Sequence, residues 1–311
     1  MNNSTLSLLF KRGLIYFCHQ ILVMKIAILT SAAMPQMLPY DMEVVSMLKQ
    51  RGIDTSIYVW DEIIRSNPNE LINYDAILIR TIWDYFKKVD QFVKLLDFLD
   101  ALKLPVFNPV EIMRWNMNKQ YLQELECEGI EIIPTLFNYH NSVNSFQEAL
   151  SLGWKKMILK PMISGNSYHT FVVNANEEAE FDNLINQYFQ NRQFMLQEFI
   201  PEISDGEISV IYFSNGYSYS VKKVPKKGEY RVQFDFGGIY HFGDVDPAIR
   251  KLCDMIVKRI GNKVLYQRID GLWRDGKFLI MEVELIEPDL YLNLSDVAKN
   301  KWVESLISML N

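Results

Sequence analysis

Short apolar runs alternate with amphipathic stretches between residues 24 and 108 of the sequence. The apolar runs predict β-strands, and apolar residues at helical spacing predict helices between them. The predicted strands are Met24–Thr30, Thr55–Trp60 and Ala76–Arg80, with helices at Asp41–Arg51 and Phe92–Leu102. Strands that alternate with helices indicate a small parallel sheet covered by helices, so we expect an α/β domain here.

The second part of the chain predicts more strands than helices. Helices are expected within 111–128 and at Glu178–Phe189, Pro247–Ile260 and Asp296–Leu310. Strands are expected at Ile130–Thr135, Lys156–Pro161, Phe194–Ile200, Glu207–Phe213, Tyr217–Lys223 and Tyr230–Phe234. The last three are separated by polar turns, with Asn215-Gly216 as a hairpin signal, and are expected to be antiparallel.

Three carboxylates interrupt the apolar run from Phe278 to Pro288, FLIMEVELIEP. Side chains alternate faces along a strand, so Glu282 and Glu284 share a face and lie roughly 7 Å apart. Pro288 ends the strand because proline has no N–H for the ladder, and Glu287 can turn back toward the other two. Mg²⁺ prefers oxygen ligands of this kind and would neutralise their charge. The segment therefore predicts a metal site; the alternative is a half-exposed strand whose wet face carries glutamates.

The preceding run, Val264–Asp270, predicts a second strand of a hairpin. A two-residue loop, Asp275-Gly276, would pair Asp270 with Met281 on the wrong face. A three-residue loop, Arg274-Asp275-Gly276, with a left-handed glycine in a G1 bulge would pair Asp270 with Ile280. We expect this bulged register, which puts Asp270 on the face of the two glutamates.

The composition changes this picture little. The 311-residue chain is 49% hydrophobic and 23% charged, an ordinary globular composition with enough length for two or three lobes. Its net charge of -6, without a Lys/Arg block, argues against nucleic acid or an anionic membrane as the main partner, so small molecules are expected. Cys18, Cys127 and Cys253 are far apart and odd in number, which predicts reduced thiols in a cytoplasmic protein.

Residues 1–23 precede the first predicted strand and carry a short apolar run, GLIYFCHQILV, after Lys11 and Arg12. The run is shorter than the ~20 residues that span a bilayer, and no small-residue cleavage site follows it. We expect an extension outside the fold, and the alternative is a secretory signal.

Polar groups also stand at the ends of other predicted strands. Lys160 closes an apolar strand, which suggests an anionic partner, and the loop Ser164–Ser167 is suited to covering phosphates through backbone N–H groups. The loop after the third strand could form a substrate pocket, because open α/β sheets place ligands there, or could be anchored by an aromatic pair and an ion pair. Its polar and aromatic residues are Arg80, Trp83, Asp84 and Tyr85.

Other motifs carry less information. No GxGxxG or GxxxxGK[ST] motif supports a Rossmann dinucleotide site or a P-loop. Gly237-Gly238 predicts either a closely approached backbone or a loose turn. His140, His169 and His241 are expected to be loop or structural residues, since no GxSxG motif or Cys–His set accompanies them.

An ordered set of motifs resembles the ATP-grasp ligases. It comprises Lys119, Lys160-Pro161, QEFI at Gln197 to Ile200, Gly206-Glu207, Arg231, Asp270 and the EVE ahead of Pro288. The set is similar to prokaryotic glutathione synthetase, to RimK-type ligases and to the cycloserine-biosynthesis type of ATP-grasp protein, over roughly residues 24 to 310. The resemblance implies an ATP-grasp fold with a pre-ATP-grasp α/β domain over 24–112. Two α+β lobes would follow in an ATP-grasp domain over 113–311, whose lid lobe is about 120–200.

The resemblance also implies roles for individual residues. Lys119 and Lys160 would contact the phosphates of ATP. Adenine would be bound by the backbone of Glu198, Phe199 and Ile200, beside Gln197. Glu207 would hold the ribose or the lysine cluster. Asp270, Glu282 and Glu284 would be ligands of Mg²⁺ or Mn²⁺, and Glu284 stands where the family has asparagine, which implies tighter metal binding or a changed metal count. Lys223 and Arg231 would be catalytic, and the 162–170 loop is poorer in glycine than the family's phosphate lid.

Residues and resemblance together indicate an ATP- and Mg-dependent carboxylate–amine ligase acting on a small amino-acid-like substrate. The carboxylate would attack the γ-phosphate, and an amine would then attack the acyl phosphate while Arg231 stabilises the oxyanion. The alternatives are an ATP-binding regulatory protein without turnover, an intramolecular cyclo-ligase and a metal-dependent hydrolase. Expected partners are ATP and small substrates, and a homodimer is expected at the family level only.

Overall fold

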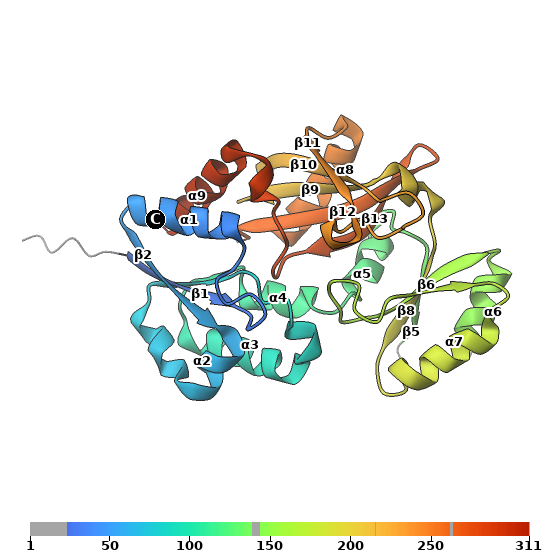
Figure 1. Ribbon diagram of the computed structural model, residues 1–311, viewed down its shortest axis with the longest axis horizontal. Helices are drawn as coiled ribbons and strands as arrows, with labels where there is room; N and C mark the ends of the chain where they lie inside the picture. Colours follow the sequence, from blue (N-terminus) through green and yellow to red (C-terminus); the bar gives the residue numbers. More distant parts are fainter. Residues whose placement is uncertain (1–23, 139–143, 215, 262–263, 311) are drawn as a thin grey trace, which may run out of the picture.

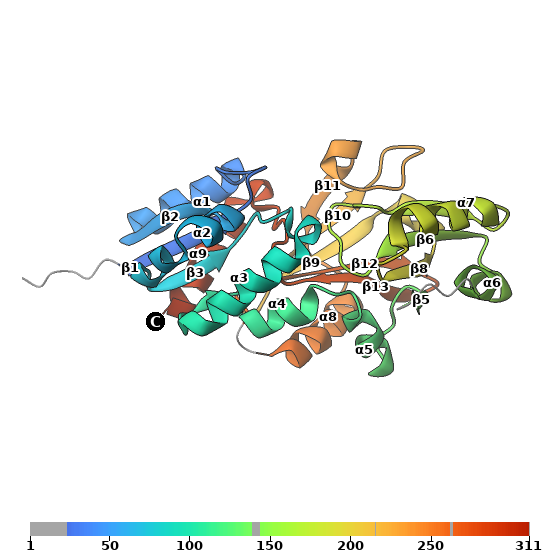
Figure 2. The ribbon, with the colours of Figure 1, turned by 90° about the horizontal axis from the view of Figure 1, so that it is seen from below.

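The structure is a computed structural model that describes residues 24–138, 144–214, 216–261 and 264–310. The predicted extension 1–23, with Cys18, lies outside the described residues, as do His140 and Asn215. Three sheets organise the described chain. Figures 1 and 2 show a parallel N-terminal sheet and a small lid sheet at opposite ends, with a five-stranded sheet between them.

The N-terminal sheet confirms the predicted α/β domain. Its strands are all parallel, in the order β2-β1-β3-β4. They are β1 (Met24–Thr30), β2 (Ile53–Val59), β3 (Ala76–Ile79) and β4 (Val106–Phe107), and the helices are α1 (Pro39–Gln50), α2 (Trp60–Ser66) and α3 (Val89–Leu102). β1 and β3 are almost wholly buried, as expected for strands covered on both faces.

The lid sheet is antiparallel, in the order β5-β8-β6-β7. It consists of β5 (Thr135–Asn138), β6 (Lys156–Pro161), β7 (Phe171–Asn174) and β8 (Phe194–Glu198), with helices α6 (Asn144–Ser151) and α7 (Glu178–Leu184). The predicted strand Ile130–Thr135 is wrong. The Ile133 amide donates to the Ile280 carbonyl, so this stretch lies against the large sheet and the lid strand begins only at Thr135.

The five-stranded sheet is antiparallel, in the order β11-β10-β9-β12-β13. Its strands are β9 (Glu207–Phe213), β10 (Gly216–Val224), β11 (Ile239–Gly243), β12 (Tyr266–Arg274) and β13 (Lys277–Glu284), with helix α8 (Pro247–Ile260). The predicted strand Tyr230–Phe234 is wrong, and β11 is the edge strand instead. A Cβ on Gly238 would lie 2.0 Å from the Val232 carbonyl oxygen, so the glycine pair does mark a close backbone approach.

Two short helices, α4 (Val110–Asn116) and α5 (Tyr121–Cys127), replace the single helix expected within 111–128. Lys119 lies in the break between them. Its amide donates to the Met162 carbonyl at 2.8 Å, which ties this turn to the end of β6. The break therefore carries Lys119 toward the lid.

One hydrophobic core joins the N-terminal domain to the large sheet. Ile26 and Leu48 of the N-terminal domain pack in the same cluster as Ile211 of β9 and Trp302 of α9 (Asp296–Leu310). The lid has a separate core, built around residues such as Phe181. The lid is thus an independently packed layer. No helix in the described part of the chain is both long and apolar enough to cross a membrane.

Candidate functional site

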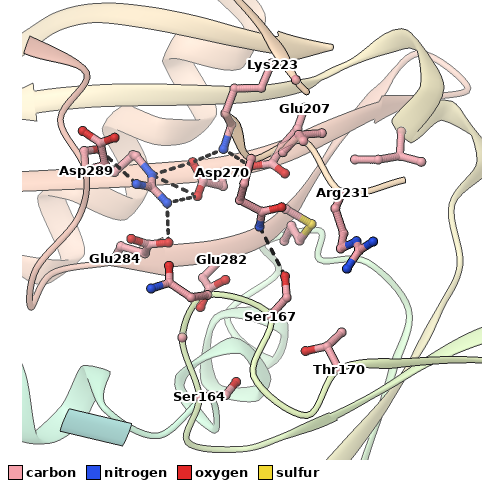
Figure 3. Close-up of a pocket in the computed structure, with 18 of the residues that line it drawn as sticks. Ser164, Ser167, Thr170, Glu207, Lys223, Arg231, Asp270, Glu282, Glu284 and Asp289 are labelled. Carbon is pink, nitrogen blue, oxygen red and sulfur yellow. Dashed lines mark hydrogen bonds and ion pairs between the residues drawn. The ribbon is translucent and has the colours of Figure 1, made fainter. Parts of the chain in front are cut away.

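A cavity of about 960 Å³ lies between the lid sheet, the five-stranded sheet and loops of the N-terminal domain (Figure 3). Every site residue predicted from the sequence lines it. These residues are Lys119, Lys160, Gln197, Glu198, Phe199, Ile200, Glu207, Lys223, Arg231, Asp270, Glu282 and Glu284. The fold thus brings the predicted set together, while the ligand of each residue stays a prediction.

The β12–β13 hairpin places the three predicted metal ligands. Asp275 and Gly276, with φ of 51° and 78°, form a two-residue loop between the paired residues Arg274 and Lys277. The expected three-residue loop is therefore wrong.

A bulge inside the hairpin corrects the register instead. Asp270 pairs with Glu282 and not with the expected Ile280, which pairs with Gly271 instead. Met281 therefore has no partner on β12 and is the extra residue of the bulge. A Cβ on Gly271 would lie 2.6 Å from the Leu279 carbonyl oxygen, so only glycine fits opposite the bulge. Asp270 and Glu282 consequently share one face, as expected, although by a different route.

Arg268 is the cation at the centre of this face, and the sequence reading missed it. Its guanidinium bonds both carboxylate oxygens of Asp270 at 2.9–3.1 Å and forms an ion pair with Glu284 across the hairpin. The two-residue spacing of Arg268 and Asp270 on one strand was the available signal. Burial would raise the pKa of Asp270, but Arg268 and Lys223 outweigh it and hold that pKa below its usual value. Burial, with Asp270 and Glu282 nearby, raises the pKa of Glu284 to about 8 despite Arg268.

Two buried lysines act on Glu282. Lys119 Nζ lies 2.7 Å from Oε1 of Glu282 and donates to the Ser164 carbonyl at 2.9 Å. Burial, reinforced by Lys119, lowers the pKa of Lys160 to about 8. Burial would raise the pKa of Glu282, but Lys119 and Lys160 outweigh it and hold that pKa below its usual value. Two lysines facing one carboxylate leave an excess of positive charge, which suits an anionic ligand.

A second ion pair lies deeper in the sheet. Lys223 of β10 pairs with Glu207 of β9, and its Nζ lies 3.9 Å from Oδ1 of Asp270. Burial would lower the pKa of Lys223, but Asp270 and Glu207 outweigh it and raise that pKa above its usual value. Glu207 is therefore engaged with the lysine, one of the two roles expected for it.

Arg231 lies in the loop between β10 and β11 at the cavity wall (Figure 3). Its side chain is bound by Glu229, with an Nη2–Oε2 distance of 2.7 Å, and its guanidinium carbon lies 3.7 Å from the ring centroid of Phe236. Hydrogen bonds from Arg231 lower the pKa of Glu229 to about 2. The arginine is thus charged and held at the cavity wall.

Another part of the cavity is apolar. Its lining includes Ile133, Ile158, Ile200, Leu272 and Met281. A flat aromatic base would bury well there.

The QEFI segment borders this apolar part. The amides of Glu198 and Phe199 already donate to the carbonyls of Pro134 and Lys156, and Gln197 Nε2 donates to Thr135 Oγ1. If this backbone binds adenine, as expected, it would do so through the Ile200 amide and the carbonyl groups, because the other two amides already donate within the protein.

The polar loop Ser164–Ser167 lines the cavity on the lid side (Figure 3). Gly165 packs against the Phe86 ring, since a Cβ there would lie 2.9 Å from two of its carbons. Gln233 Nε2 donates to Ser167 Oγ at 3.3 Å. The loop therefore contacts both the N-terminal domain and the Arg231 loop.

His169 lies beyond this loop and contacts other side chains, and its structural role stays a prediction. Its Nδ1 lies 3.0 Å from Arg192 Nη1, and its ring stacks on Tyr168 with centroids 3.8 Å apart.

The loop after β3 has features of both alternatives expected for it, an anchored loop and a wall of a pocket. Arg80 Nη2 pairs with Asp41 Oδ1 at 2.9 Å, and Asp84 accepts from Trp60 Nε1 at 2.7 Å, so these two charges anchor the loop. Trp83, together with Tyr85, lines the cavity instead.

The carboxylates fit a magnesium ion only in part. Asp270 is 2% exposed, and Arg268 bonds both of its oxygens, whereas Glu282 and Glu284 have side chains 24% and 27% exposed. In the described residues no group of three or more His, Cys, Asp or Glu is arranged to hold a metal ion. Magnesium, however, is commonly bound through one or two carboxylates together with substrate phosphates. Glu282 and Glu284 fit that mode, and the role of Asp270 stays a prediction.

Two family models match this chain in turn. The model of the N-terminal domain of D-cycloserine synthetase DcsG matches residues 26–108, and the model of the prokaryotic glutathione synthetase ATP-grasp domain matches residues 132–272. The second matched range contains the lid sheet and most of the five-stranded sheet, between which the cavity lies. The chain belongs to the ATP-grasp superfamily of ATP-dependent, carbon–nitrogen bond-forming ligases.

Individual relatives extend over most of the chain. The cycloserine biosynthesis protein DcsG of Streptomyces lavendulae is 20% identical over 92% of this chain and 99% of its own length. A crystal structure of D-cycloserine synthetase DcsG matches with a TM-score of 0.80, at 20% identity, over 92% of this chain and 100% of that one. D-alanine–D-alanine ligase from Bacillus anthracis, complexed with ATP, gives a TM-score of 0.68 at 16% identity, over 92% and 97%. The structure of the ligase PsnB complexed with Mg and ADP matches with a TM-score of 0.63 at 13% identity, over 93% of this chain and 99% of that one.

Proposed function

We propose that this protein uses ATP and Mg²⁺ to join a small carboxylate substrate to an amine through an acyl phosphate. The observation that carries the proposal is the pair of buried lysines, Lys119 and Lys160, acting on Glu282 inside the cavity. Two buried lysines that share one carboxylate partner favour an anionic ligand, and a polyphosphate is the anion that this family's ligases use. The relatives complexed with ATP, or with ADP and Mg, support the same assignment.

The cavity offers a place for each part of the nucleotide. The apolar lining around Ile200 and Met281 would take the adenine, and the two lysines with the Ser164–Ser167 loop would take the phosphates. Mg²⁺, held by Glu282 and Glu284 with Asp270 behind them, would offset phosphate charge and orient the terminal phosphate.

The chemistry needs positioned charge and no protein nucleophile. The substrate carboxylate attacks the γ-phosphate, which breaks the bond to the β-phosphate oxygen and releases ADP, and the amine then displaces inorganic phosphate from the acyl carbon. Lys119 and Lys160 would stabilise charge on the phosphates, and Arg231 would stabilise the oxyanion at the acyl carbon. Lys223, kept charged by Asp270 and Glu207, would maintain a positive field behind the reacting groups.

Trapping of the acyl phosphate tests this proposal. With ATP, Mg²⁺ and hydroxylamine, a panel of amino acids and other small carboxylic acids should yield a hydroxamate in amounts equal to the ADP released. ADP release that occurs without a carboxylate, or without any hydroxamate, would contradict a ligase acting through an acyl phosphate.

The similarity to D-cycloserine synthetase favours one second candidate, an intramolecular ligase in which acid and amine belong to one molecule. The two candidates differ in product mass. A cyclising reaction gives a product that weighs one water less than the single substrate, whereas an intermolecular reaction gives the mass of two substrates less one water.

A further inference from the structure

The segment from Ile286 to Leu290, which begins two positions after the last residue of β13, is fixed through its backbone. Each of its five consecutive carbonyls accepts a hydrogen bond from a side chain of another part of the chain. In order along the segment the donors are Tyr266, Trp83, Arg80, Arg268 and Tyr219. The backbone from which the side chains of the 286–290 segment project is therefore fixed before any ligand arrives.

Glu287 projects from this segment into the cavity and differs from the carboxylates around it. Glu282 pairs with Lys119, and Glu284 pairs with Arg268. Asp289 accepts from the Tyr40 hydroxyl at 3.0 Å and from the Tyr291 amide at 2.8 Å. Among the described residues that line the cavity, the Glu287 carboxylate is the one acidic group without a hydrogen bond or ion pair to the protein.

The walls near Glu287 are aromatic. Trp83 contacts the segment directly, through its indole N–H and the Glu287 carbonyl at 2.8 Å, and Tyr40 contacts it through Asp289. Tyr85 lines the same cavity from the N-terminal domain. Aromatic faces attract cations, so a positively charged group beside Glu287 would be stabilised by both the carboxylate and the rings.

The surroundings favour an organic cation over a second metal ion. Mg²⁺ requires a nearly complete shell of oxygen ligands, and the main-chain carbonyls of the 286–290 segment already accept hydrogen bonds from side chains. An ammonium group has three donors and needs only a few acceptors. Glu287 and Asp289, two residues apart on a fixed backbone, can supply them.

We propose that Glu287 binds the ammonium group of the carboxylate substrate, so that the substrate is a zwitterionic amino acid and not a simple or hydroxy acid. This inference rests on the proposed ligase function and specifies its substrate class. The ammonium is held at the 286–290 segment, and the carboxylate points toward Lys119 and the phosphates. Trp83 and Tyr85 would enclose it from the N-terminal domain.

Thermal melting of the full chain with a non-hydrolysable ATP analogue and Mg²⁺ tests the proposal. The probes are the twenty standard amino acids, D-alanine and D-serine, each paired where one exists with the acid that lacks the amino group, such as propionate or lactate for alanine. At least one amino acid should raise the melting temperature while its deaminated partner does not. Glu287→Gln should raise the amino acid concentration needed by about 10-fold or more, because it removes the charge of a charge-assisted hydrogen bond.

A matched control is Glu304→Gln, the same change at an exposed position on α9, which should alter neither response. Equal shifts from amino acids and deaminated acids, or no shift from any amino acid, would overturn the inference, as would an unchanged amino acid response in Glu287→Gln. Loss of the nucleotide and Mg²⁺ response in that variant would identify Glu287 as a metal ligand instead. The comparison within the unmodified protein decides the question even if the variant does not fold. If the nucleotide itself does not raise the melting temperature of the unmodified protein, the ligase function is contradicted. If only the amino acids fail to raise it, the inference about Glu287 is contradicted and the ligase function is not.

Discussion

Replacing Glu282 by glutamine is expected to lower Mg²⁺-dependent ADP release at least about 1,000-fold, a loss of the size seen when an essential charge is removed from phosphoryl transfer. The amide has the same shape and can still accept a hydrogen bond from Lys119. It lacks the negative charge that balances Lys119 and Lys160, and it is a poor ligand for a hard cation. Turnover should therefore fall while the fold is retained. ADP release at saturating ATP measures the turnover, and the melting temperature of the same variant checks that the fold is retained.

The Glu304→Gln variant again serves as the control, since it removes one exposed glutamate charge that does not line the cavity. Glu284→Gln should also impair turnover, because Glu284 is the second carboxylate open to the cavity. Unchanged turnover in both the Glu282 and the Glu284 variants would remove the metal assignment.

Replacing Asp41 by alanine is expected to lower the free energy of unfolding by about 3–5 kcal/mol, the usual cost of leaving a buried charge without its partner. Arg80 is 2% exposed and Asp41 is 4% exposed, so water cannot replace the lost carboxylate. Arg80 also donates to the Pro288 carbonyl at 3.3 Å, so its displacement should loosen the 286–290 segment. Urea unfolding gives the free energy directly.

A matched surface change separates burial from charge. Asp100 of α3 forms an ion pair with Lys103, the residue after the helix, at 3.8 Å, and both side chains are largely exposed. Asp100→Ala should cost no more than about 1 kcal/mol. If Asp41→Ala costs as little as Asp100→Ala, the buried pair is not an anchor of this fold.

The carboxylate face of the hairpin could be predicted from sequence, but the way it is built could not. Alternation along FLIMEVELIEP placed Glu282 and Glu284 together correctly. The register prediction failed because it assigned the bulge to the loop, whereas the bulge lies at Met281. Gly271 was the overlooked signal, since an isolated glycine within a strand often marks a bulge or a close backbone approach.

The loop that carries Arg231 was also misjudged. Residues 230–234 alternate like a strand, yet the Val232 carbonyl packs on Gly238 and Arg231 stacks on Phe236, which bends the chain back on itself. Such contacts depend on a paired glycine and an aromatic ring several residues away. Local alternation does not reveal them.

The remaining contacts that the sequence did not predict join residues far apart along the chain. Arg80 and Trp83 bond carbonyls of Pro288 and Glu287, about 200 positions further along the chain, and no local pattern indicates such a pairing. Arg268 was missed for a related reason. Its role depends on carboxylates from two strands, which only the folded hairpin brings together.

Thermal melting of the full chain with ATP, with Mg²⁺, and with both together tests whether the cavity binds a magnesium–nucleotide complex. A ligand that binds only the folded state at 100 times its dissociation constant adds about 2.7 kcal/mol of stability. We predict a rise in melting temperature that needs ATP and Mg²⁺ together and is lost in Glu282→Gln. The absence of a shift in melting temperature with any nucleotide, with or without Mg²⁺, would contradict nucleotide binding in this cavity.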